Sequence, residues 1–319
     1  MKVGFIGLGN VGGKLSGSLL RNGVELYVRD LNAELVDQFV AKGAKTCASN
    51  KELMETCDAV VTCLPSPAAS AAVLEAEDGL LAGMSAGKIW MEMSTTDAEE
   101  VKRLGKMVIA AGGSAVDCPV SGGCHRADTG NISIFAGCTR ETFETILPLL
   151  TKMGRRILHT GDLGSASILK VVTNYLATAN LVSCCEALVT CKAAGMDLGV
   201  AYEAIAASSG TSFVHETESQ VILNGSRDIS FTMDLVKKDI GLFDAIAQSH
   251  NVPLELSPLL CKIFDDGIEK YGPREWSPNI IKRLEDVTGL DIRAPGFPAE
   301  MLDDEPEEPG YEIIPKNRT

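Results

Sequence analysis

Apolar positions divide the chain into two halves of different character. Up to about residue 163, short apolar runs alternate with segments in which apolar residues recur at helical spacing. This alternation is typical of a parallel β-sheet with crossover helices. After the first two strands, the sequence predicts strands at 59–62, 89–91, 114–120, 132–136 and 156–158, and its clearest helices at 97–111 and 141–153.

From residue 165 to about 194 the strand signals stop, and the chain is apolar without a proline. A helix of this length spans about 45 Å, enough to pass from one domain into the next. Because nearly every face is apolar, we expect the helix to be buried. Ser167, Lys170, Asn174 and Thr178 follow at steps of three and four, which places them in one polar stripe.

Lys170 is the exceptional residue of that stripe. A lysine within a buried helix is costly unless it is paired or lines a cavity. Burial also disfavours its charged form, which brings proton transfer near neutral pH within reach. The alternative is a lysine that extends to solvent or forms a structural ion pair.

The predicted architecture is an α/β Rossmann-type N-terminal domain plus an all-α C-terminal domain, joined by a long interdomain helix. Its expected parts are a dinucleotide-binding domain at 1–163, a helical domain at 164–297 that begins with the long helix (about 164–195), and a tail at 298–319. The tail is rich in acids and proline, so we expect it to be extended or disordered.

The turn after the first strand carries a GxGxxG pattern. It consists of Gly7, Leu8, Gly9, Asn10, Val11 and Gly12. A strand that turns into a helix through these glycines presents backbone N–H groups and the positive end of the helix dipole to a pyrophosphate. Glycines also mark ordinary turns, so the pattern alone is weak evidence.

Asp30 completes the fingerprint at the end of the second strand. A carboxylate there accepts hydrogen bonds from both ribose hydroxyls and repels a 2′-phosphate, which favours NAD and makes NADP less suitable. Asp30 could instead cap a turn or pair with Arg29. Arg29 is counter-evidence, because an arginine beside the acid could reach a 2′-phosphate.

Three loops follow strands at the edge where ligands of such sheets bind. They contain Leu64 and Pro65, the hydroxyl cluster Ser94, Thr95 and Thr96, and the run Ser121, Gly122, Gly123, Cys124, His125 and Arg126. One hydroxyl of the cluster could cap the next helix. The two glycines expose consecutive N–H groups suited to an anion, or form a plain turn. His125 and Arg126 would add positive charge, unless they are solvated.

Composition excludes several classes of protein. A net charge of −14 argues against a nucleic-acid or membrane-surface partner. We expect no signal peptide and no unbroken stretch long enough for a bilayer. The ten cysteines form no CxxC pair, which favours a reducing cytoplasm. The histidines are scattered, so we predict no metal site.

Four motifs together resemble the β-hydroxyacid dehydrogenase family, which includes 3-hydroxyisobutyrate dehydrogenases and tartronate semialdehyde reductases and is related to 6-phosphogluconate dehydrogenase. They are GFIGLGNVGGKL at 4–15, DCPVSGG at 117–123, GDLGSASILKVVTN at 161–174 and FTMDLVKKD at 231–239. The resemblance extends to about residue 298. It also implies a helical domain that makes the subunit contact of a homodimer or homotetramer.

The resemblance assigns a role to each matching residue. It implies that Lys170 is the catalytic lysine and that Asn174 orients the substrate. Gly7, Gly9, Gly12 and Asp30 would bind the dinucleotide, and Leu64, Pro65 and Thr95 would line its nicotinamide half. Ser121, Gly122 and Gly123 would bind the substrate carboxylate. Phe231 and Lys238 would contribute to the closed site, with Asp239 beside Lys238. Thr173 departs from the family, which usually has an asparagine there. His125 and Arg126 suggest a small substrate with extra negative charge.

The function expected from these residues is NAD-dependent hydride transfer to or from a small 3-hydroxy acid or its semialdehyde. One alternative is an imine reductase or other reductase on the same scaffold, with a phosphonate-like or sulfonate-like substrate. A decarboxylating phosphogluconate-type enzyme is another, although the helical domain is short for that type. The last is a non-catalytic NAD-binding module, which would leave Lys170, the Ser-Gly-Gly loop and Asn174 unexplained.

Overall fold

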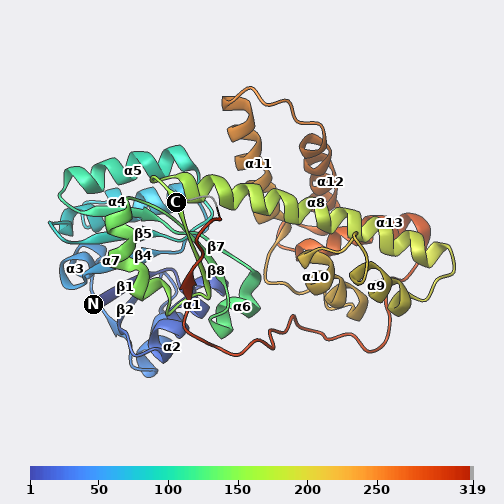
Figure 1. Cartoon of the computed structure of the whole chain (residues 1–319), viewed down its shortest axis with the longest axis horizontal. Coiled ribbons are helices and arrows are strands. Elements are labelled where there is room, and N and C mark those ends of the chain that lie inside the picture. Colours follow the sequence, from blue (N-terminus) through green and yellow to red (C-terminus); the bar gives the residue numbers. More distant parts are fainter. Residues whose placement is uncertain (317–319) are drawn as a thin grey trace. The chain divides into compact units, whose positions relative to one another are not determined.

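The computed structural model describes residues 1–316 of the chain (Figure 1). The chain forms two compact units. The first comprises residues 1–170 and the tail from Asp304, and the second comprises Val171–Asp303. The N-terminal Rossmann-type fold and the helical C-terminal fold predicted from the sequence are both present.

The first unit is built on one ten-stranded sheet in which β10-β9-β8-β6-β5-β4-β1-β2-β3 is the main order and β7 pairs with β8. Its strands are β1 (Lys2–Ile6), β2 (Glu25–Arg29), β3 (Lys45–Thr46), β4 (Ala59–Thr62), β5 (Ile89–Glu92), β6 (Ser114–Asp117), β7 (Val120–Ser121), β8 (Ser133–Gly137), β9 (Arg156–Gly161) and β10 (Tyr311–Glu312). Its helices are α1 (Asn10–Arg21), α2 (Ala33–Ala41), α3 (Asn50–Thr56), α4 (Pro67–Glu75), η1 (Leu80–Gly83), α5 (Ala98–Ala110), α6 (Gly123–Thr129) and α7 (Arg140–Leu150).

Both faces of the sheet are covered, because consecutive residues of its central strands belong to different apolar clusters. Phe5 packs in the cluster that contains α1 and α7 residues, whereas its neighbour Ile6 packs in the cluster that contains α3, α4 and α5 residues. In β4, Val61 belongs to the same cluster as Phe5, and Val60 belongs to the same cluster as Ile6. Strands buried on two faces read as continuous apolar runs, which is why the sequence identified them.

One predicted strand, 114–120, is in fact two. β6 ends at Asp117 and β7 begins at Val120, with Pro119 between them. β6 pairs in parallel with β5, whereas β7 pairs antiparallel with β8. Proline has no N–H to donate and restricts the residue before it, so the chain changes partners there.

β8 reverses the direction of the sheet. It pairs antiparallel with β6 and in parallel with β9. Asp117, the last residue of β6, pairs with Gly137, the last residue of β8, so the starts of β8 and β9 extend beyond the edge where β1, β4, β5 and β6 end. This edge is the one at which ligands of open α/β sheets bind.

The tail is extended over most of its length, but it is also an integrated part of the first unit. β10 pairs in parallel with β9, and Ile313 N donates to Ile157 O at 2.7 Å. A Cβ on Gly310 would lie 2.0 Å from Gly154 O, so only glycine allows the tail to approach so closely. The acidic composition did not predict this docking.

The second unit is helical. Its elements are α9 (Leu198–Ala206), α10 (Phe213–Asn224), α11 (Met233–Ser249), α12 (Leu256–Tyr271), η2 (Ser277–Ile281) and α13 (Lys282–Thr288), together with most of α8 (Ser165–Ala193). Its core contains Leu181 and Leu188 of α8, Ile240 of α11 and Phe264 of α12, all nearly or fully buried.

Within residues 1–316, α8 is one helix that has the length and composition needed to cross a bilayer. It qualifies because the polar stripe adds little charge to the helix. Our expectation that this helix is buried is met only in part, because Leu169 is 38% and Leu176 is 54% exposed. Leu181, Cys185 and Leu188 pack in the helical core, and its first turn is hydrogen-bonded to Asp117 of the sheet.

Candidate active site

The GxGxxG loop joins β1 to α1 with the geometry that a pyrophosphate site requires. Gly7 has φ +98°, and a Cβ there would lie 2.2 Å from Cys63 O. A Cβ on Gly12 would lie 2.0 Å from Gly7 O, so helix and turn pack in direct backbone contact. Gly9 has nothing within 4 Å of its Cβ position and gives α1 no side-chain cap. The N-terminus of α1 is therefore accessible to a ligand through Gly9.

Asp30 lies directly beside this loop. One carboxylate oxygen accepts from Leu8 N at 2.6 Å and the other from Asn32 N at 2.8 Å. The acid therefore does cap a turn, and it also joins the end of β2 to the glycine loop. Arg29 is directed elsewhere, because its guanidinium donates to Asn50 Oδ1 at 2.9 Å and to Cys47 O.

The loops after β4 and β5 are held together by a buried polar chain. Leu64 N donates to Ser94 Oγ at 2.7 Å, and Ser94 N donates to a Glu92 carboxyl oxygen at 2.8 Å. Glu92 is fully buried, and burial raises the pKa of its carboxyl. Pro65 is exposed and Thr95 half-buried beside this chain. The sequence pointed to these loops but not to Glu92, which reads as the last residue of a strand.

The hydroxyl cluster does not cap the helix that follows it. The N-cap of α5 is Asp97, whose side chain accepts from Glu100 N at 2.8 Å. A carboxylate suits the positive end of a helix dipole better than a hydroxyl does. Ser94 is therefore available to accept the Leu64 N–H.

Ser121, Gly122 and Gly123 form a sharp turn from β7 into α6. Gly122 and Gly123 both have positive φ, +130° and +86°, which explains why two glycines are needed. The side chain of Arg126 lies against this turn, because a Cβ on Gly122 would be 3.3 Å from Arg126 Cδ. Arg126 pairs with Glu305 of the tail at 3.2 Å, a partner that the sequence did not predict.

Asp117 fastens the start of α8 to the end of β6. One carboxyl oxygen accepts from Gly164 N at 2.7 Å, and the other accepts from Ser167 N at 2.7 Å and Ser167 Oγ at 2.9 Å. Asp117 is fully buried, and burial raises the pKa of its carboxyl while these bonds offset part of the rise. A Cβ on Gly137 would lie 2.3 Å from Asp117 Oδ1, and the absence of a side chain at Gly137 therefore leaves room for the Asp117 carboxyl. We call the hydrogen bonds of Asp117 to Gly164 and Ser167 the clamp.

Lys170 follows Ser167 by one turn of α8 and is 9% exposed. The clamp therefore acts on the same helical turn that positions the candidate catalytic amine. Ser167 and Thr178, the uncharged ends of the predicted polar stripe, are also buried. Three residues of the predicted stripe are thus buried, and the fourth, Asn174, is half-buried.

Asn174 is held by an acid that the sequence analysis had noted only as a neighbour of Lys238. Asn174 Nδ2 donates to Asp239 Oδ2 at 2.5 Å, and Asp239 is 1% exposed. Lys238 Nζ lies 2.9 Å from the other Asp239 oxygen. Phe231, just before α11, packs partly buried against the helical core. The partner of Asn174 lies 65 residues along the chain, so local spacing could not reveal it.

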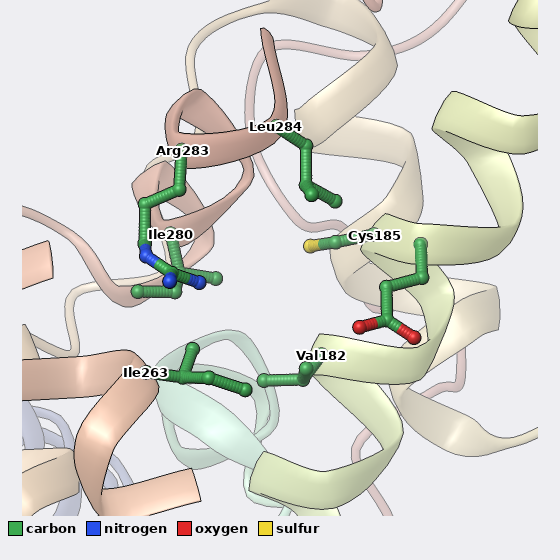
Figure 2. Close-up of a pocket in the computed structure, with 7 residues that line it drawn as sticks. Val182, Cys185, Ile263, Ile280, Arg283 and Leu284 are labelled. Atoms are coloured by element: carbon green, nitrogen blue, oxygen red, sulfur yellow. The ribbon is translucent and has the colours of Figure 1, made fainter. Parts of the chain in front are cut away.

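Two small cavities lie away from the candidate residues. The cavity in the helical unit has a volume of about 20 Å³ and is lined by Val182, Cys185, Glu186, Ile263, Ile280, Arg283 and Leu284. Figure 2 shows Val182 and Ile263 directed toward one another across it. It is large enough for one water molecule and too small for a hydroxy acid. Among residues 1–316, no group of three or more histidine, cysteine or acidic side chains could hold a metal ion.

Two family models match consecutive parts of the chain. The NAD-binding domain of 6-phosphogluconate dehydrogenase matches residues 2–161. The NAD-binding domain of NADP-dependent 3-hydroxyisobutyrate dehydrogenase matches residues 164–284. The boundary between the matches coincides with the start of α8 at Ser165.

Known proteins are similar over nearly their whole length. A 2-(hydroxymethyl)glutarate dehydrogenase from Eubacterium barkeri is 34% identical over 293 residues, 92% of this chain and 97% of that protein. A 3-sulfolactaldehyde reductase from Escherichia coli is 29% identical over 290 residues, 90% of this chain and 97% of that protein. The crystal structure of a 3-hydroxyisobutyrate dehydrogenase from Salmonella typhimurium has a TM-score of 0.79 at 27% identity, covering 89% of this chain and 99% of the other.

Proposed function

Because this chain belongs to the β-hydroxyacid dehydrogenase family, an NAD(P)-dependent oxidoreductase family, we propose that it transfers hydride between NAD and a small 3-hydroxy acid or its semialdehyde. The observation that carries this proposal is the placement of Lys170. Its buried amine lies one helical turn after Ser167, which is hydrogen-bonded to Asp117. Asp117 ends β6, and the chain continues from there through β7 into the Ser121–Gly123 loop. A module that only bound a dinucleotide would need neither feature.

The dinucleotide fits the loop at the start of α1. The open side of Gly9 admits a pyrophosphate, and Asp30 lies where a ribose hydroxyl would be bound. The nicotinamide ring supplies the hydride chemistry when it is bound. Leu64, Pro65 and Thr95 would line its half of the site, and we assign Lys238 to cofactor binding as well. Engagement of Arg29 by Asn50 supports NAD over NADP, since this arginine is not directed at a 2′-phosphate.

The chain's own residues would manage the proton and the orientation of the substrate. Neutral Lys170 accepts the hydroxyl proton during oxidation, and its protonated form donates during reduction. Asp239 accepts from the Asn174 amide nitrogen and so fixes the orientation of this side chain, to which we assign the role of orienting the substrate. Ser121, Gly122 and Gly123 would bind the substrate carboxylate, and we assign Phe231 to substrate binding as well. Holding the acid at one place fixes which carbon faces the cofactor.

Absorbance at 340 nm tests the proposal directly. The purified chain should reduce NAD in the presence of at least one small 3-hydroxy acid in a panel that also contains phosphonate and sulfonate analogues. Cyclic imines assayed with NADH and NADPH address the imine reductase alternative. Turnover of imines alone, or turnover of nothing in the panel despite tight NAD binding, would contradict the proposal.

Asp30 should determine the cofactor preference. Replacing Asp30 with asparagine keeps an oxygen for the Leu8 or Asn32 N–H but removes the charge that repels a 2′-phosphate. We expect kcat/KM to rise about tenfold for NADP and to fall about tenfold for NAD, since bonds to charged groups contribute about 1.5–3 kcal/mol. Steady-state kinetics with both cofactors measures the change.

Asp58→Asn is the matched control for this change. Asp58 also accepts a backbone N–H, from Lys2 at 2.7 Å, but it lies at the opposite end of β1 from the glycine loop. The preference of the Asp58→Asn variant for NAD over NADP should equal that of the unmodified chain. An unchanged NAD to NADP ratio in Asp30→Asn would remove Asp30 from the cofactor site.

A further inference from the structure

The tail presents a carboxylate to two arginines of the first unit. Glu305 Oε1 accepts from Arg126 Nη2 at 3.2 Å, and Glu305 Oε2 lies 4.0 Å from Arg156 Nη2. The backbone oxygen of Glu305 accepts from Asn131 Nδ2 at 2.8 Å. Each carboxylate oxygen therefore faces a different guanidinium, which is the arrangement of a carboxylate-binding site.

These arginines lie beside the loop proposed to bind the substrate acid. Ser121 pairs with Ser133 across β7 and β8, and Ser133 pairs with Arg156 across β8 and β9. The Cα atoms of Ser121 and Arg156 are thus two strand spacings apart, about 10 Å, and their side chains share one face of the sheet. Arg126 lies against Gly122 of the same loop.

Glu305 makes its ion pairs at the surface of the protein. Its side chain is 46% exposed and that of Arg126 is 22% exposed, and such exposed pairs contribute little stability. The tail is anchored independently further on, where Glu308 pairs with Arg155 and Glu312 pairs with Arg140. Glu305 can therefore leave its arginines while β10 stays in the sheet.

We propose that Arg126 and Arg156 form a second carboxylate subsite, which takes the distal acid of a dicarboxylic 3-hydroxy acid and which Glu305 occupies in this structure. The proposal rests on the proposed function and narrows its substrate class. A glutarate derivative, the class for which the Eubacterium barkeri relative is named, has the two acids that the Ser121–Gly123 loop and the arginines would separately bind. Glu305 then competes with the substrate within the same molecule.

Calorimetric titration of the full chain with glutarate and with butyrate, each with and without NAD, tests the subsite without relying on turnover. Glu305→Gln removes the competing charge, so the Kd for glutarate should fall about two- to fivefold while that for butyrate stays the same. Arg126→Gln should raise the Kd for glutarate about three- to tenfold, because a bond to a charged group is lost. Glu308→Gln removes a different ion pair of the same tail and should behave like the unmodified chain.

The proposal is overturned if Glu305→Gln leaves the Kd for glutarate unchanged, or if it changes the Kd for butyrate by the same factor. It is also overturned if Arg126→Gln binds glutarate as tightly as the unmodified chain. The 340 nm assay judges the dehydrogenase function separately. A chain that binds glutarate as described but oxidises no hydroxy acid would retain the subsite and lose the proposed function.

Discussion

Replacing Lys170 with methionine should lower kcat by about 10²- to 10⁴-fold, the usual contribution of a positioned general acid or base. Methionine has nearly the length of lysine but cannot accept or donate the proton, so α8 should keep its packing. Because the dinucleotide loop lies on β1 and α1, the Kd for NAD should stay within about twofold of its original value. Stopped-flow and steady-state absorbance at 340 nm measure the rates, and fluorescence titration measures cofactor binding.

Lys192→Met is the control for this experiment. It makes the same chemical change in the last turn of α8, away from the polar stripe. Its kcat should equal that of the unmodified chain. A Lys170→Met enzyme that kept more than about a tenth of its turnover would show that the proton is handled by another group.

The second large effect is expected at Asp117, and it concerns stability. Asp117→Ala leaves three buried donors without their acceptor, namely the N–H groups of Gly164 and Ser167 and the Ser167 hydroxyl. Each unsatisfied buried group costs about 1–3 kcal/mol, so the free energy of unfolding should fall by about 3–5 kcal/mol. Urea denaturation followed by circular dichroism measures this loss.

Ser167→Ala separates the parts of the clamp. It removes the hydroxyl but keeps both backbone N–H bonds to Asp117, and it should cost only about 1 kcal/mol. If Asp117→Ala were no more harmful than Ser167→Ala, the clamp would not hold the start of α8. If the clamp also positions Lys170, Asp117→Ala should lose turnover at temperatures where it remains folded.

The sequence predicted those features that depend on contacts close along the chain. The GxGxxG turn, the acid after β2 and the long helix all follow from local spacing, and each lies where it was expected. The helix was predicted at 165–194 and spans Ser165–Ala193. The roles of individual site residues remain predictions, since geometry alone does not assign chemistry.

What the sequence did not predict depends on partners far apart in the chain. Asp117 reads as the end of a strand, and its hydrogen-bond partner Ser167 is 50 residues away. Arg126 reads as a cation available to a ligand, but Glu305, 179 residues later, neutralises it. Acidic, proline-containing composition predicts an extended tail correctly, but it cannot show that basic side chains of the sheet domain bind the tail.

The docking of β10 also constrains how a newly made chain can fold. The ribosome produces β9 and then the entire helical unit before it reaches Tyr311, a delay on the order of ten seconds at ordinary synthesis rates. Throughout this interval the nascent sheet ends at β9, whose unpaired backbone groups form an open edge that other chains can join. Docking of β10 covers Arg156 and Ile157 at the start of that edge, so a chain truncated before Tyr311 should aggregate more readily than the full chain, although its dinucleotide-binding sequence is intact.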